Sequence, residues 1–86
     1  MLKVEFTAQA DDDILRLDRP VARRIVEKIE WFCKNSDQVE PEPLTGRFKG
    51  KCKLKAGDWR IIYTLVDAPQ TMTIYAIEHR SKVYRK

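Results

Sequence analysis

The spacing of apolar residues changes along this 86-residue chain. Residues 2–6 alternate apolar and polar, which predicts a strand. Residues 8–17 and 19–34 repeat apolar side chains every three to four positions, which predicts two helices joined by a short turn. Alternation returns over residues 49–65, and residues 71–77 are apolar on both parities, which predicts a central strand. The order β-α-α-β-β-β predicts an α+β fold, with two helices packed on one face of a mainly antiparallel four-stranded sheet.

The alternating segment 49–65 is predicted to form a hairpin with Ala56-Gly57 at its turn. With Lys55 opposite Asp58, one face would carry the apolar residues Cys52, Leu54, Trp59, Ile61 and Tyr63. The other face would carry the exposed cations Lys51, Lys53, Lys55 and Arg60. A shift of the pairing by one residue would mix the two sets, so the pattern itself specifies which side chains share a face.

The helices carry more specific signals. Thr7 is suited to cap the first helix, and the apolar stripe of the second helix consists of Ala22, Ile25, Val26, Ile29, Phe32 and Cys33. Asp11, Asp12 and Asp13 are consecutive, so their side chains diverge by about 100° each around a helix. They therefore do not predict a metal site, and neither cysteine has metal-ligand spacing. We expect no metal and no cofactor.

Charge divides the chain in two. Residues 1–43 hold seven Lys and Arg against ten Asp and Glu, whereas residues 44–86 hold ten against three. Lysines often protect exposed strands, so a solvated surface is one interpretation of the hairpin cations. Like charges opposite one another destabilise a sheet, however, and a phosphate-rich partner would explain their concentration.

Several classes of protein are disfavoured. The chain contains no apolar run of transmembrane length, no signal segment and no nucleotide-binding glycine loop. One histidine cannot support a Ser-His-Asp or Cys-His site by itself. We expect one domain, residues 1–86, located in the cytoplasm and not associated with a membrane.

The remaining chemistry is basic. Lysine, arginine and tyrosine can together cleave RNA, because the 2′-hydroxyl beside the scissile phosphate is a built-in nucleophile. The protein must accept that proton, stabilise the phosphorane and protonate the leaving 5′-oxygen.

Four segments carry a family resemblance: Leu44-Thr45-Gly46, Lys51-Cys52-Lys53-Leu54, Gly57-Asp58-Trp59-Arg60-Ile61-Ile62-Tyr63 and Glu78-His79-Arg80-Ser81-Lys82-Val83-Tyr84. In this order and spacing the chain resembles the RelE/ParE toxin superfamily over its whole length. The resemblance implies the toxin of a type II toxin–antitoxin pair, with a cognate antitoxin, the ribosome and mRNA as partners. The RelE-like branch cleaves mRNA in the ribosomal A site without a metal.

Carried onto this chain, the catalytic set of that branch falls on Lys51, Lys53, Arg60, Arg80 and Tyr84. We further assign substrate binding to Lys49, Lys55, His79 and Lys82. The segment between Arg80 and Tyr84 is shorter than in the RelE pattern, and the chain stops two residues later. The ParE-like branch shares the fold but inhibits DNA gyrase by protein contact without catalysis. A module that binds RNA without cleaving it is a third interpretation.

Overall fold

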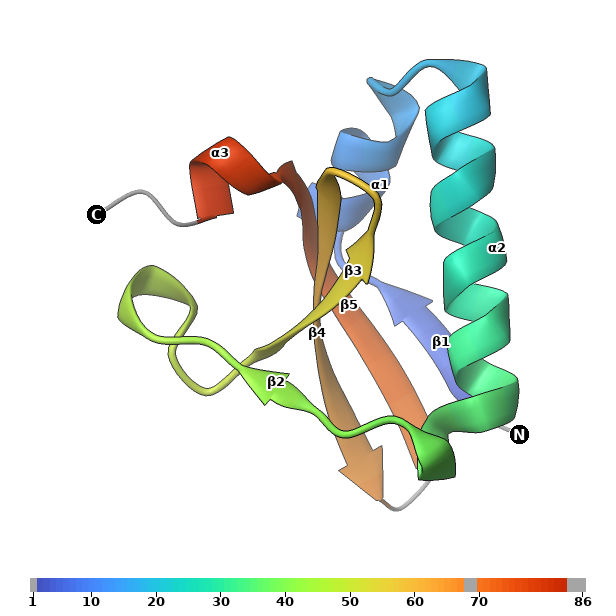
Figure 1. The fold of residues 1–86 in the computed structure, drawn as a ribbon, viewed down its shortest axis with the longest axis vertical. Coiled ribbons are helices and arrows are strands. Elements are labelled where there is room, and N and C mark those ends of the chain that lie inside the picture. Colours follow the sequence, from blue (N-terminus) through green and yellow to red (C-terminus); the bar gives the residue numbers. More distant parts are fainter. Residues whose placement is uncertain (1, 68–69, 84–86) are drawn as a thin grey trace.

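One sheet of five strands organises residues 2–67 and 70–83, the part of the chain that the computed structural model describes (Figure 1). The elements, in chain order, are β1 (Lys3–Phe6), α1 (Ala8–Leu15), α2 (Arg19–Asn35), the 3-10 turn η1 (Ser36–Gln38), β2 (Glu42–Pro43), the 3-10 turn η2 (Gly46–Phe48), β3 (Cys52–Ala56), β4 (Trp59–Asp67), β5 (Gln70–His79) and α3 (Arg80–Val83). The strand order is β1-β5-β4-β3-β2, and β1 runs parallel to β5 whereas the other neighbouring pairs are antiparallel. The predicted α+β order and the central position of β5 are confirmed.

The sheet has one strand more than the sequence predicts. The proline-containing connector forms it, because Glu42 pairs with Lys53 and Pro43 pairs with Cys52. Proline lacks an N–H group and is tolerated at the edge of a sheet, which is where β2 lies. The short helix α3 is also absent from the predicted order, since four residues are too few to show a helical period.

The hairpin turn lies one residue later than predicted. Ala56 pairs with Trp59 and Lys55 with Arg60, so Gly57 and Asp58 form the turn. Gly57 has a φ of 62°, and a two-residue turn with glycine first requires this left-handed conformation. The predicted pairing of Lys55 with Asp58 is therefore wrong. The pairing shifts by two residues rather than one, so every side chain keeps its predicted face.

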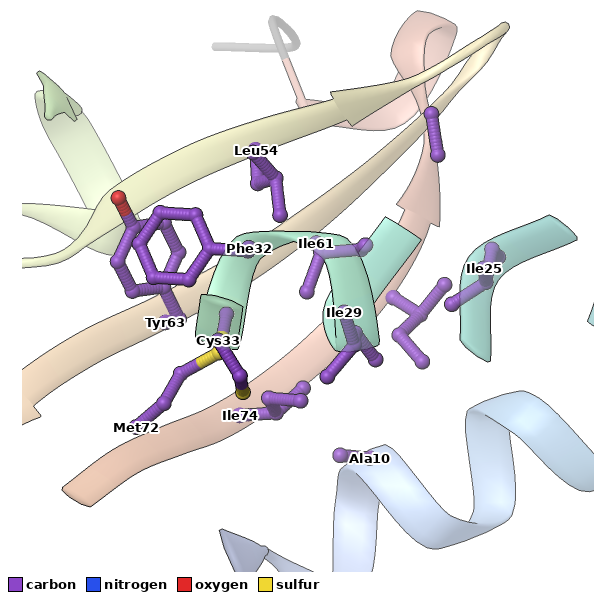
Figure 2. Close-up of a cluster of buried hydrophobic side chains, with 12 residues drawn as sticks. Ala10, Ile25, Ile29, Phe32, Cys33, Leu54, Ile61, Tyr63, Met72 and Ile74 are labelled. Atoms are coloured by element: carbon purple, nitrogen blue, oxygen red, sulfur yellow. The ribbon is translucent and has the colours of Figure 1, made fainter. Parts of the chain in front are cut away.

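The main core lies between the sheet and the two long helices. Ala10 of α1 and Ile25, Ile29 and Phe32 of α2 pack against side chains of β3, β4 and β5: Leu54, Ile61, Tyr63, Met72 and Ile74 (Figure 2). The rings of Phe32 and Tyr63 meet edge to face, with 5.1 Å between their centroids. Each large apolar side chain that is fully buried contributes about 1.5–3 kcal/mol, so this layer supplies most of the folding free energy.

The helix signals are confirmed with one exception. The Thr7 hydroxyl oxygen accepts a hydrogen bond from the Ala10 amide at 3.2 Å, as an N-cap should. Val26, predicted to belong to the core stripe, is 40% exposed. Adjacent helical side chains point about 100° apart, and here Ile25, which is fully buried, takes the position that faces the sheet, so Val26 lies at the solvent edge of the stripe.

Candidate nucleic-acid interface

The sheet face opposite α1 and α2, called the second face below, carries the candidate site. Strand pairing places Lys55 beside Arg60 and Arg60 beside Glu78 in one row of side chains. The next row holds Lys53, Ile62 and Ala76. Figure 1 shows α3 and the segment between β2 and β3 on this side, whereas α2 lies on the other.

Arg60 is the most constrained cation of the second face. Only 8% of the residue is exposed, although the sequence predicts a solvated side chain. Its Nη1 donates hydrogen bonds to the carbonyl oxygens of Gly57 at 2.8 Å and Trp59 at 3.0 Å. The guanidinium stays protonated when buried. The turn therefore holds a permanent positive charge in a fixed orientation.

Glu78 brings a carboxylate into the same row, and a second arginine compensates it. Arg47, in η2, donates from Nη2 to Glu78 and, at 3.0 Å, to the carbonyl oxygen of Lys82. The Arg47 guanidinium also lies 4.5 Å from the centroid of the Phe48 ring. Because Glu78 is neutralised from the loop, it reduces the field of Arg60 less than an unpaired carboxylate would.

The centre of the second face is apolar rather than charged. Ile62, Ala76 and Val83 are buried together, and Leu44 and Phe48 pack against them. The sequence predicts a concentrated cationic surface on this face of the hairpin. The difference arises because Val83 of α3 and Phe48 of η2 pack over Ile62 on this side of the sheet. This small cluster attaches α3 and η2 to the sheet.

Tyr75 reaches the second face through a β-bulge. Ile62 pairs with Ala76 but Tyr63 pairs with Ile74, which leaves Tyr75 as the extra residue. An extra residue in one strand turns two consecutive side chains to the same side. Tyr75 is half-buried, and Lys51 Nζ lies 4.7 Å from the centroid of its ring.

The end of β5 and the start of α3 surround the hairpin turn. The Arg80 amide donates to the Asp58 carbonyl oxygen at 2.8 Å, and Arg80 Nε lies 3.7 Å from Asp58 Oδ1. His79 pairs with Trp59, and their rings meet edge to face at 5.4 Å. By register His79 faces the helix side of the sheet, and its Nδ1 accepts a hydrogen bond from the Ser81 amide at 3.2 Å.

The predicted site residues thus fall into three groups. The structure brings Lys53, Lys55 and Arg60 together on the second face and places Arg80 at the same end of the sheet. Lys51 lies with Tyr75, farther from the turn. Lys49 and Lys82 are exposed, His79 faces the other side, and Tyr84 lies outside the described residues.

Sequence reasoning missed three residues of this surface: Arg47, Tyr75 and Glu78. Arg47 and Phe48 lie between Gly46 and Gly50, and a basic–aromatic pair between two glycines could have drawn attention to that loop. Nothing in an alternating pattern shows the bulge that turns Tyr75.

Among the aspartates of α1, Asp13 serves the fold. Asp13 Oδ2 accepts a hydrogen bond from the Ile77 amide at 2.9 Å, which satisfies a β5 donor beyond the short strand β1. Within residues 2–67 and 70–83, no group of three or more His, Cys, Asp and Glu side chains could hold a metal ion. No helix in that part of the chain is long and apolar enough to span a membrane.

Comparison with known proteins identifies the fold and its family. The family model for the ParE toxin of the type II toxin–antitoxin system parDE matches residues 4–84. This chain belongs to the RelE/ParE superfamily of type II toxins. The match extends over both long helices and the whole of the second face.

Individual relatives agree with this family. The toxin RelE of Mycobacterium tuberculosis is 30% identical over 82 residues, which cover 95% of this chain and 84% of that protein. The crystal structure of the RelBE2 toxin–antitoxin complex from the same organism matches with a TM-score of 0.78 and 25% identity, over 92% of this chain and 98% of that one. The isolated Escherichia coli RelE toxin matches with a TM-score of 0.75 and 20% identity, over 98% and 92% of the two chains.

Proposed function

We propose that this toxin is a ribosome-dependent mRNA endonuclease that uses the second face to cleave RNA without a metal. The observation that carries the proposal is the row formed by Lys55 and the buried Arg60, with Lys53 in the next row. A cation that is already oriented by two backbone carbonyls needs little reorganisation when charge develops on a phosphorane. A surface that only needed to be solvated would not require an arginine held in one orientation.

The reaction needs a proton acceptor, a charge stabiliser and a proton donor. The 2′-oxygen attacks the adjacent phosphorus as its proton leaves to a base, and the bond from phosphorus to the 5′-oxygen breaks as that oxygen gains a proton. The products are a 2′,3′-cyclic phosphate and a 5′-hydroxyl. We assign the role of base to Lys53, a phosphate contact to Lys51, stabilisation of the phosphorane to Arg60, and the leaving-group side to Arg80.

The remaining assignments concern the substrate around the scissile bond. Tyr84 completes the proposed catalytic set by stacking on a base or orienting the phosphate. Lys49, Lys55 and Lys82, all exposed, are proposed to contact neighbouring phosphates. His79 is proposed to make a phosphate contact at the sheet end, with its Nδ1 already engaged by Ser81.

We also propose a cognate antitoxin as the partner. The RelBE2 neighbour was solved as a toxin–antitoxin complex, and a free ribonuclease would harm the cell that makes it. An acidic segment that folds on binding would suit the basic surface. The chain would act as one domain in the cytoplasm. Harmless expression of the chain in a growing cell without a partner would count against this proposal.

Inhibition of DNA gyrase is the second candidate, because the matching family model is that of the ParE toxin. This function would need protein contacts alone and would make the buried Arg60 a structural residue. The two candidates therefore differ in whether conservative changes on the second face remove the toxic activity.

The test combines translating ribosomes, a metal chelator and analysis of the RNA ends, with a parallel gyrase supercoiling assay. We expect cleavage that survives chelation and leaves a 2′,3′-cyclic phosphate or 3′-phosphate with a 5′-hydroxyl. Lys53→Ala should abolish it, whereas Arg23→Ala, which removes an exposed cation from α2, should not. Intact mRNA together with blocked supercoiling would establish the gyrase function instead. Binding of RNA without any cut would leave only an RNA-binding module.

A further inference from the structure

Tyr75 is fixed at the surface by its backbone. The Thr7 hydroxyl donates to the Tyr75 carbonyl oxygen at 3.0 Å, and the Thr7 amide donates to the neighbouring Ile74 carbonyl oxygen at 3.0 Å. The bulge is therefore tied to the junction of β1 and α1. Its aromatic ring is half-buried on the second face, in a position that the main core does not use.

Lys51 completes an aromatic–cation pair with this ring, at 4.7 Å from Nζ to the centroid. The chain has a similar pair on α2, where Lys28 Nζ lies 4.2 Å from the centroid of a Trp31 ring. The surroundings differ. Tyr75 shares its face with Lys53 and Arg60, whereas Trp31 is exposed on a helix that covers the other face.

We propose that Tyr75 and Lys51 form a nucleotide-binding subsite for single-stranded RNA, with the Tyr75 ring stacking on a base and Lys51 contacting its phosphate. Aromatic side chains stack on all four bases, and a lysine beside the ring supplies charge for the backbone. This proposal rests on the proposed function only for the identity of the ligand, single-stranded RNA.

The subsite is separate from the position proposed for the scissile phosphate. Lys51 precedes Lys55 by four residues, which at a rise of about 3.3 Å per residue places them about 13 Å apart along the strand direction. Lys55 pairs with Arg60. A base stacked on Tyr75 therefore belongs to a different nucleotide of the RNA from the one whose phosphate lies at Arg60. Stacking at Tyr75 would hold the RNA strand in a fixed position across the second face.

The test measures binding to an uncleavable 2′-O-methyl oligonucleotide of roughly eight nucleotides, within the range of known single-strand sites. Fluorescence anisotropy at low salt gives the Kd for the wild-type chain, Tyr75→Phe and Tyr75→Leu. We expect Tyr75→Phe to bind like the wild type, because the ring is retained. Tyr75→Leu should bind at least about fivefold more weakly.

An abasic scan separates stacking from other effects. At one position, removing the base should weaken binding to the wild type but not to Tyr75→Leu, since the variant has already lost the stacking partner. Tyr75→Leu should leave the salt dependence of Kd unchanged, whereas Lys51→Ala should reduce its slope by about one phosphate contact. The matched control is Trp31→Leu, which breaks the equivalent pair on α2 and should bind normally.

Each contrary result is informative. Equal affinity of Tyr75→Leu and the wild type for the oligonucleotide overturns the subsite. A loss of affinity in Tyr75→Leu that is the same whichever base is removed also overturns it, because Tyr75 would then only support the local structure. Failure of the wild type to bind the oligonucleotide also overturns it. If base-dependent binding is found but ribosomes show no cleavage, the subsite stands and the endonuclease function fails. If cleavage is unaffected by Tyr75→Leu in both rate and position, the endonuclease function stands and the subsite fails.

Discussion

The two faces of the sheet are built on different principles. On the face under α1 and α2, the sheet and the helices share a continuous layer of apolar side chains, in which Ile25 and Phe32 of α2 and Ile61 of β4 are each at most 1% exposed. The second face has a small apolar cluster in its centre, with charged groups around it. The first face supplies most of the free energy of folding, whereas the second face holds cations in fixed positions. Substitutions on the two faces should therefore change different measurable properties.

The largest effect on stability is expected at Phe32. Phe32→Ala should lower the free energy of unfolding by roughly 3–5 kcal/mol, because the ring is buried against Tyr63 and leaves a cavity. Urea denaturation followed by circular dichroism measures this change. Leu15→Ala, at a position that is 81% exposed, is the control and should be nearly neutral. An equal loss in both variants would contradict the distinction between core and surface.

On the second face, Arg60→Lys should separate activity from folding. Lysine keeps the charge and a donor for the carbonyl oxygens of Gly57 and Trp59, which Nη1 alone engages, but it lacks the other N–H groups of the planar guanidinium. We expect cleavage to slow by about 10²–10³-fold, as on losing an oriented donor to a transition state. Arg60→Ala is a poorer test, because Arg60 is buried and its loss leaves those carbonyls without their donor.

Single-turnover cleavage on translating ribosomes measures the rate, and thermal unfolding measures stability. Arg23→Lys, at an exposed position of α2, is the matched control and should change neither the cleavage rate nor the stability. Arg60→Lys cleaving at the wild-type rate would remove the main support for the proposed site.

The buried hydroxyl of Tyr63 should make the stability of the core depend on pH in the alkaline range. Burial, the largest cause, raises the pKa of its hydroxyl to about 12, with smaller contributions from Cys52 and Glu42. An unfolded tyrosine ionises near 10, so folding favours the protonated form. This contribution to stability is complete below about pH 10 and is lost as the pH rises from there through about 12.

Tyr63→Phe isolates this contribution. The hydroxyl oxygen is buried and makes no hydrogen bond, so its removal should be neutral or stabilise the fold by about 1 kcal/mol at neutral pH. Unfolding curves for the two proteins, measured from pH 8 upward, should diverge further above about pH 10. Parallel curves over that range would contradict the assignment to Tyr63.

The smallest effect is expected for the Arg47–Glu78 pair. Arg47 is about half exposed, so the pair should contribute at most about 1 kcal/mol to stability. Its electrostatic role is more specific. Arg47→Ala should weaken RNA binding severalfold by leaving Glu78 uncompensated beside Arg60, and adding Glu78→Gln should restore it. Kd values for the two single variants and the double variant measure this coupling, and additive losses would contradict it.

The fold was largely predictable because periodicity is a local property. The stripe of α2 and the alternation of β3 and β4 fix which side chains are buried, and even the misplaced hairpin turn left the two faces unchanged. The candidate site was less predictable. Its lysines follow the alternation, but Arg47 and Tyr75 depend on a loop and a bulge whose positions no local period records.

By itself the sequence determined the order of the elements, the two faces of the hairpin and the cationic character of one hairpin face. These properties follow from the charge and the hydrophobicity of each residue and its near neighbours in the chain. Tertiary structure alone decided that β2 extends the sheet, that Arg60 is buried at the turn and that Arg47 neutralises Glu78. Each of these depends on contacts between residues far apart in the chain. Such contacts exist only once the strands have paired and the loops have closed over them.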